Sequence, residues 1–162
     1  GFDKDRIHEE HGSIHHWQCS NYHCSRTHKE KGLVDISNKN LDDFDALRCG
    51  HCNERLRPNI CMFFDADWMD SIYDKQENLE RRYMNNLLEK KKVNVVVIEI
   101  GAGEDIRTIR SKSELAAFDF DTKLIRINPD QEESFSDKYT IHINESAAKG
   151  ISMLFDHLDE KK

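Results

Sequence analysis

Apolar and polar positions in the second half of the chain follow helical and strand-like spacings in turn. From Asp67 onwards, apolar residues recur at four- and seven-residue intervals, which predicts a helix that ends near residue 90. The segment VNVVVIEI at 93–100 is β-branched and almost continuously apolar, which is typical of a strand buried on both faces of a parallel sheet. The same reasoning predicts a helix over 104–118, strands over 123–128 and 139–144, and a closing helix over 145–158. This order predicts an α/β fold that contains one half of a doubly wound parallel sheet.

The first half of the chain is more polar, and its pattern is weaker. Residues 5–10 predict a short strand that ends at a His-Gly-Ser turn. Residues 14–18 alternate weakly between apolar and polar and lead to Cys19, and a second short strand is expected over 32–37, GLVDIS. The sequence therefore predicts a small insert here that carries chemistry-bearing residues.

Composition and charge narrow the classes of partner. The chain has 162 residues, of which 37% are hydrophobic and 34% charged, and its net charge is −7. An acidic chain is poorly suited to clamp a phosphate backbone, so we expect no nucleic-acid partner. No segment approaches the about 18 apolar residues of a membrane span, so we expect no membrane partner either.

Four of the five cysteines form two short pairs. Cys19 and Cys24 have the spacing C-x4-C, and Cys49 and Cys52 have the spacing C-x2-C. This pattern is typical of a tetrahedral, all-thiolate structural zinc site on a small ribbon; free thiols are the alternative. Paired metal-binding cysteines and a charged N-terminus without a signal peptide favour a cytoplasmic location.

A glycine-containing turn follows the buried strand. The sequence Gly101-Ala102-Gly103 lies between that strand and the next helix, where backbone N–H groups can receive a phosphate or a ribose hydroxyl. Glu104 and Asp105 follow and would repel a phosphate, which favours ribose or no ligand. Glycines that serve only packing remain an equal alternative. Similarly, Asn128 ends a strand at the edge where open α/β sheets bind ligands, or simply terminates it before a proline.

Taken together, these motifs resemble the sirtuins, the NAD-dependent protein deacylases. The order EEHGSIHHWQC, C-x4-C, C-x2-C, LRPNICMFF, GAG and IRIN spans almost the whole chain and is most similar to bacterial-type members. The resemblance implies a Rossmann-like NAD-binding domain from residues 1–16 and 61–162. It also implies an inserted four-cysteine zinc-ribbon module at 17–60, in which the zinc is structural.

The resemblance also implies an activity and a set of site residues. His11 corresponds to the general base in transfer of an acyl group from acyl-lysine to ADP-ribose, with release of nicotinamide. A base with a pKa near neutrality suits this chemistry. The expected partner is an acylated protein substrate. The implied NAD contacts are Gly101, Ala102, Gly103, Asn128, Ser146 and Ala147. The implied wall of the acyl-lysine channel is Met62, Phe63, Phe64 and Asp65.

The sequence also departs from the family pattern. A GAGxS phosphate-binding loop and a Gln-Asn-x-Asp motif, which normally precede the histidine, are absent from this chain. We therefore expect the isolated chain to be inactive and an N-terminal remainder of the same protein to complete the site. Phe64 stands where the family has glycine, which would narrow the channel.

Two alternatives stay open. One is a non-catalytic zinc-ribbon binding module, which would bind zinc without NAD. The other is an NAD hydrolase or ADP-ribosyl transferase on the same fold, since His11 suits either reaction.

Overall fold

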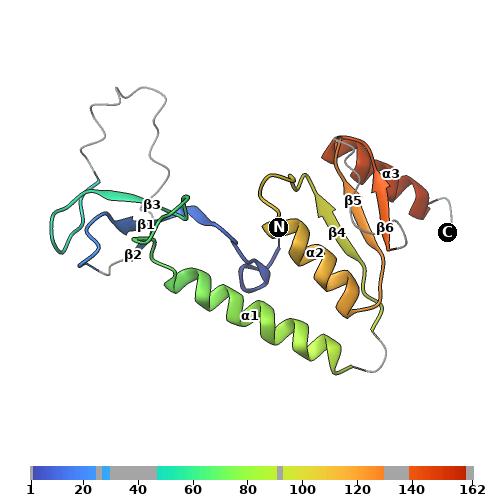
Figure 1. The fold of residues 1–162 in the computed structure, drawn as a ribbon, viewed down its shortest axis with the longest axis horizontal. Coiled ribbons are helices and arrows are strands. Elements are labelled where there is room, and N and C mark those ends of the chain that lie inside the picture. The colour runs from blue at the N-terminus through green and yellow to red at the C-terminus, as the bar shows by residue number, and fades with distance from the viewer. Residues whose placement is uncertain (1, 25–26, 30–46, 91–92, 130–138, 160–162) are drawn as a thin grey trace. The chain divides into compact units, whose positions relative to one another are not determined.

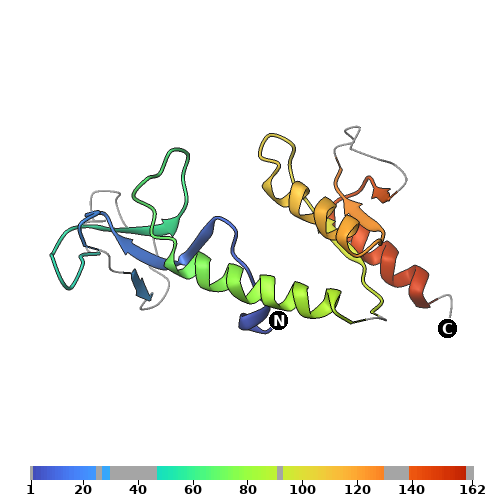
Figure 2. The same cartoon turned by 60° about the horizontal axis from the view of Figure 1, so that its bottom comes forward.

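The computed structural model describes residues 2–24, 27–29, 47–90, 93–129 and 139–159 (Figures 1 and 2). The expected strand at 32–37 lies outside the described residues. The chain divides into two compact units, Gly1–Met84 and Asn85–Lys162. Each unit is described by itself below. This division does not test the domain boundaries expected from the sequence, which stay a prediction.

The first unit contains a three-stranded antiparallel sheet. Its strand order is β2 (Thr27–Lys29), β1 (Gly12–Cys19) and β3 (Leu56–Ile60). The pairing of β1 with β3 shifts register between Ser13 and Trp17, so β1 is bulged just after the His-Gly-Ser turn. Helix α1 (Ser71–Leu88) follows, begins four residues later than expected, and continues into the second unit.

The strand expected over residues 5–10 is wrong. The structure has a short 3₁₀-helix there, η1 (Lys4–Arg6), followed by irregular backbone. The Asp3 side chain accepts a hydrogen bond from the Asp5 backbone nitrogen at 3.2 Å, and the Asp3 carbonyl accepts one from Arg6 at 2.9 Å. An aspartate that caps a turn in this way competes with strand formation.

The second unit confirms the expected parallel sheet. Strands β4 (Val97–Ile100), β5 (Leu124–Ile127) and β6 (Thr140–Ile143) pair in that order, and both pairings are parallel. Helices α2 (Thr108–Asp119) and α3 (Ala147–Asp159) complete the expected order of elements.

The two helices cover opposite faces of this sheet. Ser113 of α2 donates a hydrogen bond to Glu99 of β4, so α2 lies on the face that carries Glu99 and its neighbour on β5, Arg126. Gly150 of α3 lies against Ile127, where a Cβ atom would come within 2.4 Å of the isoleucine Cγ2. Successive residues of a strand point to opposite faces, so Arg126 faces α2 and Ile127 faces α3. The two helices therefore lie on opposite faces of the sheet. Pairing also aligns isoleucines from all three strands on the α3 face: Ile98, Ile125 and Ile141 in one row, and Ile100, Ile127 and Ile143 in the next.

Burial of β4 is less complete than its apolar sequence predicts. Ile98 and Ile100 are 48% and 44% exposed, whereas Glu99 is buried. The deeply buried apolar residues of the second unit are Ala117, Leu124 and Ile127. Among the helices described, none is both long enough and apolar enough to cross a membrane.

Candidate functional site

The four predicted cysteine ligands come together in the first unit. One sulfur atom from each of Cys19, Cys24, Cys49 and Cys52 lies within 4.8 Å of every other. The Cys19 and Cys52 sulfurs are 3.4 Å apart, and the Cys24 and Cys49 sulfurs are 3.7 Å apart. These distances exceed the about 2.05 Å of a disulfide bond, so the four cysteines do not form disulfides with one another. The cluster can therefore hold a metal ion.

Backbone turns place each cysteine pair. Cys19 ends β1, and the Cys24 nitrogen bonds to the Asn21 carbonyl at 2.9 Å. On the other side, the Cys49 nitrogen bonds to the Glu54 carbonyl at 2.8 Å, and the Asn53 nitrogen bonds to the Cys49 carbonyl at 2.9 Å. Short turns of this kind bring both pairs to one point with little loop entropy to lose.

The electrostatics of the cluster favour a cation. Burial, followed by hydrogen bonding with the other three thiols, raises the pKa of Cys24 to about 12. Burial also raises the pKa of Cys19. Without a metal, the Cys19 and Cys24 thiols would thus stay protonated at neutral pH, and a bound cation would supply the charge that stabilises their thiolates.

His11 lies on the tight turn that leads into β1. Its imidazole is exposed, and its carbonyl accepts a hydrogen bond from the Cys61 nitrogen at 2.9 Å. The next residue, Gly12, has φ +77°. A Cβ atom at Gly12 would lie 2.0 Å from the Asn59 carbonyl oxygen, so only glycine allows β1 to approach β3 this closely.

Side-chain amides stabilise this turn and the adjacent strands through hydrogen bonds. Gln18 and Asn59 are each 1% exposed, and the Asn59 amide donates to Gln18 Oε1 at 2.8 Å. The same Gln18 oxygen accepts from the Met69 nitrogen at 3.0 Å. Glu9 pairs with Gln76, donating from its backbone nitrogen and accepting at its carboxylate. The backbone around His11 is thereby tied to β3 and α1.

Replacing Gly12 with alanine is expected to destabilise the first unit. The left-handed backbone alone costs about 1–2 kcal/mol for an L-residue, and the contact with Asn59 adds to it. Gly50→Ala is the matched control, because nothing lies within 4 Å of a Cβ atom there. Thermal melts of both variants measure the difference. Equal melting temperatures for the two variants would show that the turn tolerates a side chain.

The predicted substrate wall forms a tight, exposed loop after β3. Met62, Phe63 and Phe64 are 62%, 77% and 105% exposed, and Phe64 has φ +58°. Arg57 holds the loop by donating two hydrogen bonds to the Asp65 carboxylate, at 2.7 and 2.8 Å. These bonds hold the pKa of Asp65 below its usual range. Phe64 thus takes the backbone conformation that a glycine at this position would supply without strain.

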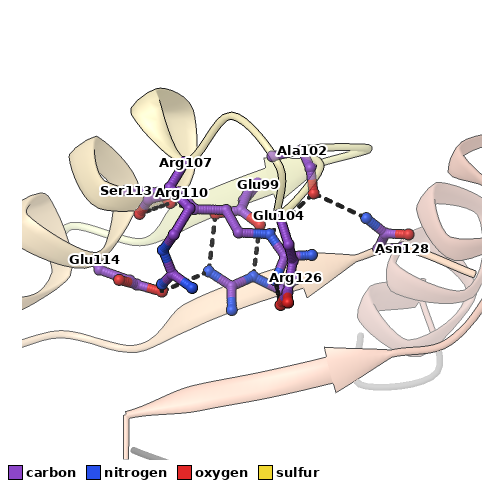
Figure 3. Close-up of polar contacts among 9 residues, drawn as sticks. All are labelled: Glu99, Ala102, Glu104, Arg107, Arg110, Ser113, Glu114, Arg126 and Asn128. Atoms are coloured by element: carbon purple, nitrogen blue, oxygen red, sulfur yellow. Dashed lines mark hydrogen bonds and ion pairs between the residues drawn. The ribbon is translucent and has the colours of Figure 1, made fainter. Parts of the chain in front are cut away.

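In the second unit, the predicted cofactor contacts gather at the carboxyl edge of the parallel sheet. The loop 101–103 follows β4, Asn128 follows β5, and Ser146 and Ala147 follow β6. Gly101 and Gly103 are exposed, and nothing lies within 4 Å of a Cβ atom at either one. Figure 3 shows the Asn128 amide turned towards this loop, where it donates to the Ala102 carbonyl at 2.9 Å. The edge at which open α/β sheets bind ligands is therefore the one that carries these residues.

A buried ion-pair network beneath this edge was not expected from the sequence. Arg126 and Glu99 are each 3% exposed, and Arg126 donates to the Glu99 carboxylate at 2.5 and 3.0 Å (Figure 3). Arg126 also pairs with Glu114 of α2 at 3.0 Å. A signal was present in the sequence, because VIEI and LIRI each carry one charge inside an apolar strand. Opposite charges at equivalent positions of neighbouring strands indicate a pair.

Neither a protein-family profile nor a curated protein sequence matches this chain. Among solved structures, the chain is similar to a Sir2 homologue, determined as a histidine-to-asparagine mutant in complex with ADP ribose. The TM-score is 0.56 and the sequence identity 18%, over 94% of this chain and 52% of that protein. The chain thus spans about half the length of that structure. Together with the four-cysteine cluster, this likeness shows that the chain has a sirtuin-like α/β fold.

Proposed function

We propose that this chain carries the catalytic base and the metal module of an NAD-dependent protein-lysine deacylase. The observation that carries the proposal is the His-Gly-Ser turn. It presents an exposed His11, whose carbonyl accepts a hydrogen bond from Cys61, the residue before the loop 62–65. The fold is similar to that of a Sir2 homologue determined in complex with ADP ribose.

We assign the metal as structural zinc. Four sulfurs at about 2.3 Å from a tetrahedral zinc would lie about 3.8 Å apart. The 3.4 and 3.7 Å pairs are close to that spacing. Four thiolates leave no open coordination position, so the metal would not take part in the reaction.

The residues at the sheet edge fit the adenosine end of NAD. The open space above Gly101 and Gly103 admits a ligand, and Ser146 and Ala147 are exposed beside the same edge. When bound, NAD supplies a ribose carbon from which nicotinamide can leave. His11 accepts the proton of a ribose hydroxyl at an imidazole nitrogen, and Met62 to Asp65 orient the acyl-lysine. An acylated protein is the substrate, and a cytoplasmic location belongs to the same proposal.

Replacing His11 with alanine is expected to abolish deacylation. The assay uses the complete protein that contains this chain, an acyl-lysine peptide and NAD, and measures both nicotinamide and deacylated peptide. Loss of a general base lowers the rate by about 10²–10⁴-fold. His15→Ala is the control, because His15 is an exposed histidine on β1, the strand that follows the His11 turn.

The outcomes separate the proposed functions. Wild-type turnover in the His11→Ala protein would remove His11 from the mechanism. Nicotinamide release that does not require the peptide would favour an NAD hydrolase. Zinc binding without any binding of ADP-ribose would favour the non-catalytic module.

A further inference from the structure

The loop 101–104 is held by side chains from both of the elements that flank it. Arg110 of α2 donates from Nε to the Ala102 carbonyl at 3.0 Å, and Asn128 donates to the same oxygen at 2.9 Å (Figure 3). A carbonyl oxygen has two lone pairs, so these two donors satisfy it. Their different directions fix the orientation of the peptide group, and with it the backbone N–H that follows.

Arg110 also holds a second point of the same loop. Its Nη1 pairs with the Glu104 carboxylate, and its side chain is only 3% exposed. A buried guanidinium is costly unless its donors are satisfied, and here the loop itself supplies acceptors at Ala102 and Glu104. The loop and the first turns of α2 are therefore joined through one side chain.

This contact changes the electrostatics expected from the sequence. Glu104 and Asp105 stand before α2 and would repel an anionic ligand at the glycine turn. Because Arg110 pairs with Glu104, one of the two charges is neutralised within the loop. The arginine thus affects both the shape of the turn and its charge.

We propose that Arg110 is a positioning residue of the cofactor site: through Ala102 and Glu104 it sets the conformation in which the loop 101–104 receives the adenosine end of NAD. The inference rests on the proposed function, because it assumes that this edge binds NAD. Arg110 acts through the loop.

Two variants distinguish the effect of Arg110 on the conformation of the loop from its effect on the charge of the loop. Arg110→Lys keeps the positive charge, but a lysine cannot span both acceptors with a planar fork. Glu104→Ala removes one anchor together with its negative charge. If only the charge of the loop matters, Glu104→Ala binds ADP-ribose more tightly because a negative charge is removed. If Arg110 positions the loop through Glu104, the same variant binds ADP-ribose more weakly. Glu104 itself is partly exposed, but its removal leaves the buried Arg110 guanidinium without its carboxylate partner and with the Ala102 carbonyl as its remaining acceptor.

Two measurements on the full chain test the proposal. The first is hydrogen exchange of the backbone amides of residues 102–104 by NMR, without ligand. The second is a calorimetric titration with ADP-ribose. Arg107→Lys is the control, because Arg107 immediately precedes the same helix but is 47% exposed and pairs with Glu114. We expect faster amide exchange of the loop in both test variants. In Arg110→Lys we also expect the affinity for ADP-ribose to fall by about tenfold or more, whereas exchange and affinity stay unchanged in the control.

Unchanged exchange in the loop of Glu104→Ala and Arg110→Lys would overturn the proposal, as would tighter ADP-ribose binding in Glu104→Ala. Should Arg110→Lys fail to fold, the amide exchange and the ADP-ribose binding of Glu104→Ala still test the proposal. If the wild-type chain alone does not bind ADP-ribose, the titration is repeated on the protein used in the deacylation assay. Absence of binding there overturns the assignment of this edge to NAD, while the exchange data still show whether Arg110 holds the loop.

Discussion

Replacing Cys49 with serine is expected to release the metal and unfold the sheet around it. Cys19, Cys24 and Cys49 are the buried core of the described part of this region, and Cys52, Leu56 and Met69 are the partly buried residues that pack against them there. Among these described residues, little apolar surface other than the cysteines stabilises the sheet. The binding energy of a structural zinc ion, about 10–16 kcal/mol at neutral pH, is then part of the folding energy.

Metal content and the thermal melt of the purified chain measure this loss. Cys61→Ser is the matched control, since Cys61 is a free cysteine outside the four-sulfur cluster. The control is expected to keep one metal ion per chain. A Cys49→Ser chain with one metal ion and an unchanged melting curve would show that the cluster does not hold the fold.

Replacing Arg126 with methionine is expected to have the second-largest effect on stability, about 3–5 kcal/mol. The substitution removes both hydrogen bonds to Glu99 and leaves that carboxylate 3% exposed and without its cation. Removing one partner of a buried ion pair costs this much because the remaining charge stays buried, without its partner and with little solvation.

Denaturant unfolding of the chain measures the change. Arg107→Met removes a neighbouring arginine that is 47% exposed, and is expected to cost less than about 1 kcal/mol. The double variant Glu99→Leu with Arg126→Met is expected to recover most of the loss, because both charges are then absent. If Arg126→Met unfolds at the same denaturant concentration as Arg107→Met, the buried pair is not a determinant of stability.

The four-cysteine cluster was the most predictable part of the molecule, because the spacing of the cysteines indicates which of them come together. Two turns, each with at most four residues between its cysteines, can bring the four cysteines together whatever the conformation of the segment that connects them. The order of elements in the second unit was predictable for a similar reason, since a β-branched run such as 93–100 has few alternatives. The strand nonetheless begins at Val97 and not at residue 93. The ends of a strand depend on its pairing, here with β5, and not on its own sequence alone.

Other features depend on contacts between distant residues. The predicted strand at 5–10 failed because the short-range capping by Asp3 outweighs a weak alternation. The link between Arg110 and Ala102 depends on the path of a loop, for which spacing gives no information. Even the pair Glu99 and Arg126, with its visible signal, requires that β4 and β5 be neighbours in the stated alignment.

The pair of charges inside β4 and β5 also protects the sheet from misassembly. Side chains alternate between the two faces, so sliding β5 by one residue against β4 would exchange the two sets. Arg126 would then point into the rows of isoleucines, and an isoleucine would meet Glu99. Each strand is otherwise nearly all isoleucine, leucine and valine, and would accept such a slip at little cost. The pair of Glu99 and Arg126 therefore distinguishes the observed alignment of β4 and β5 from the alignment shifted by one residue.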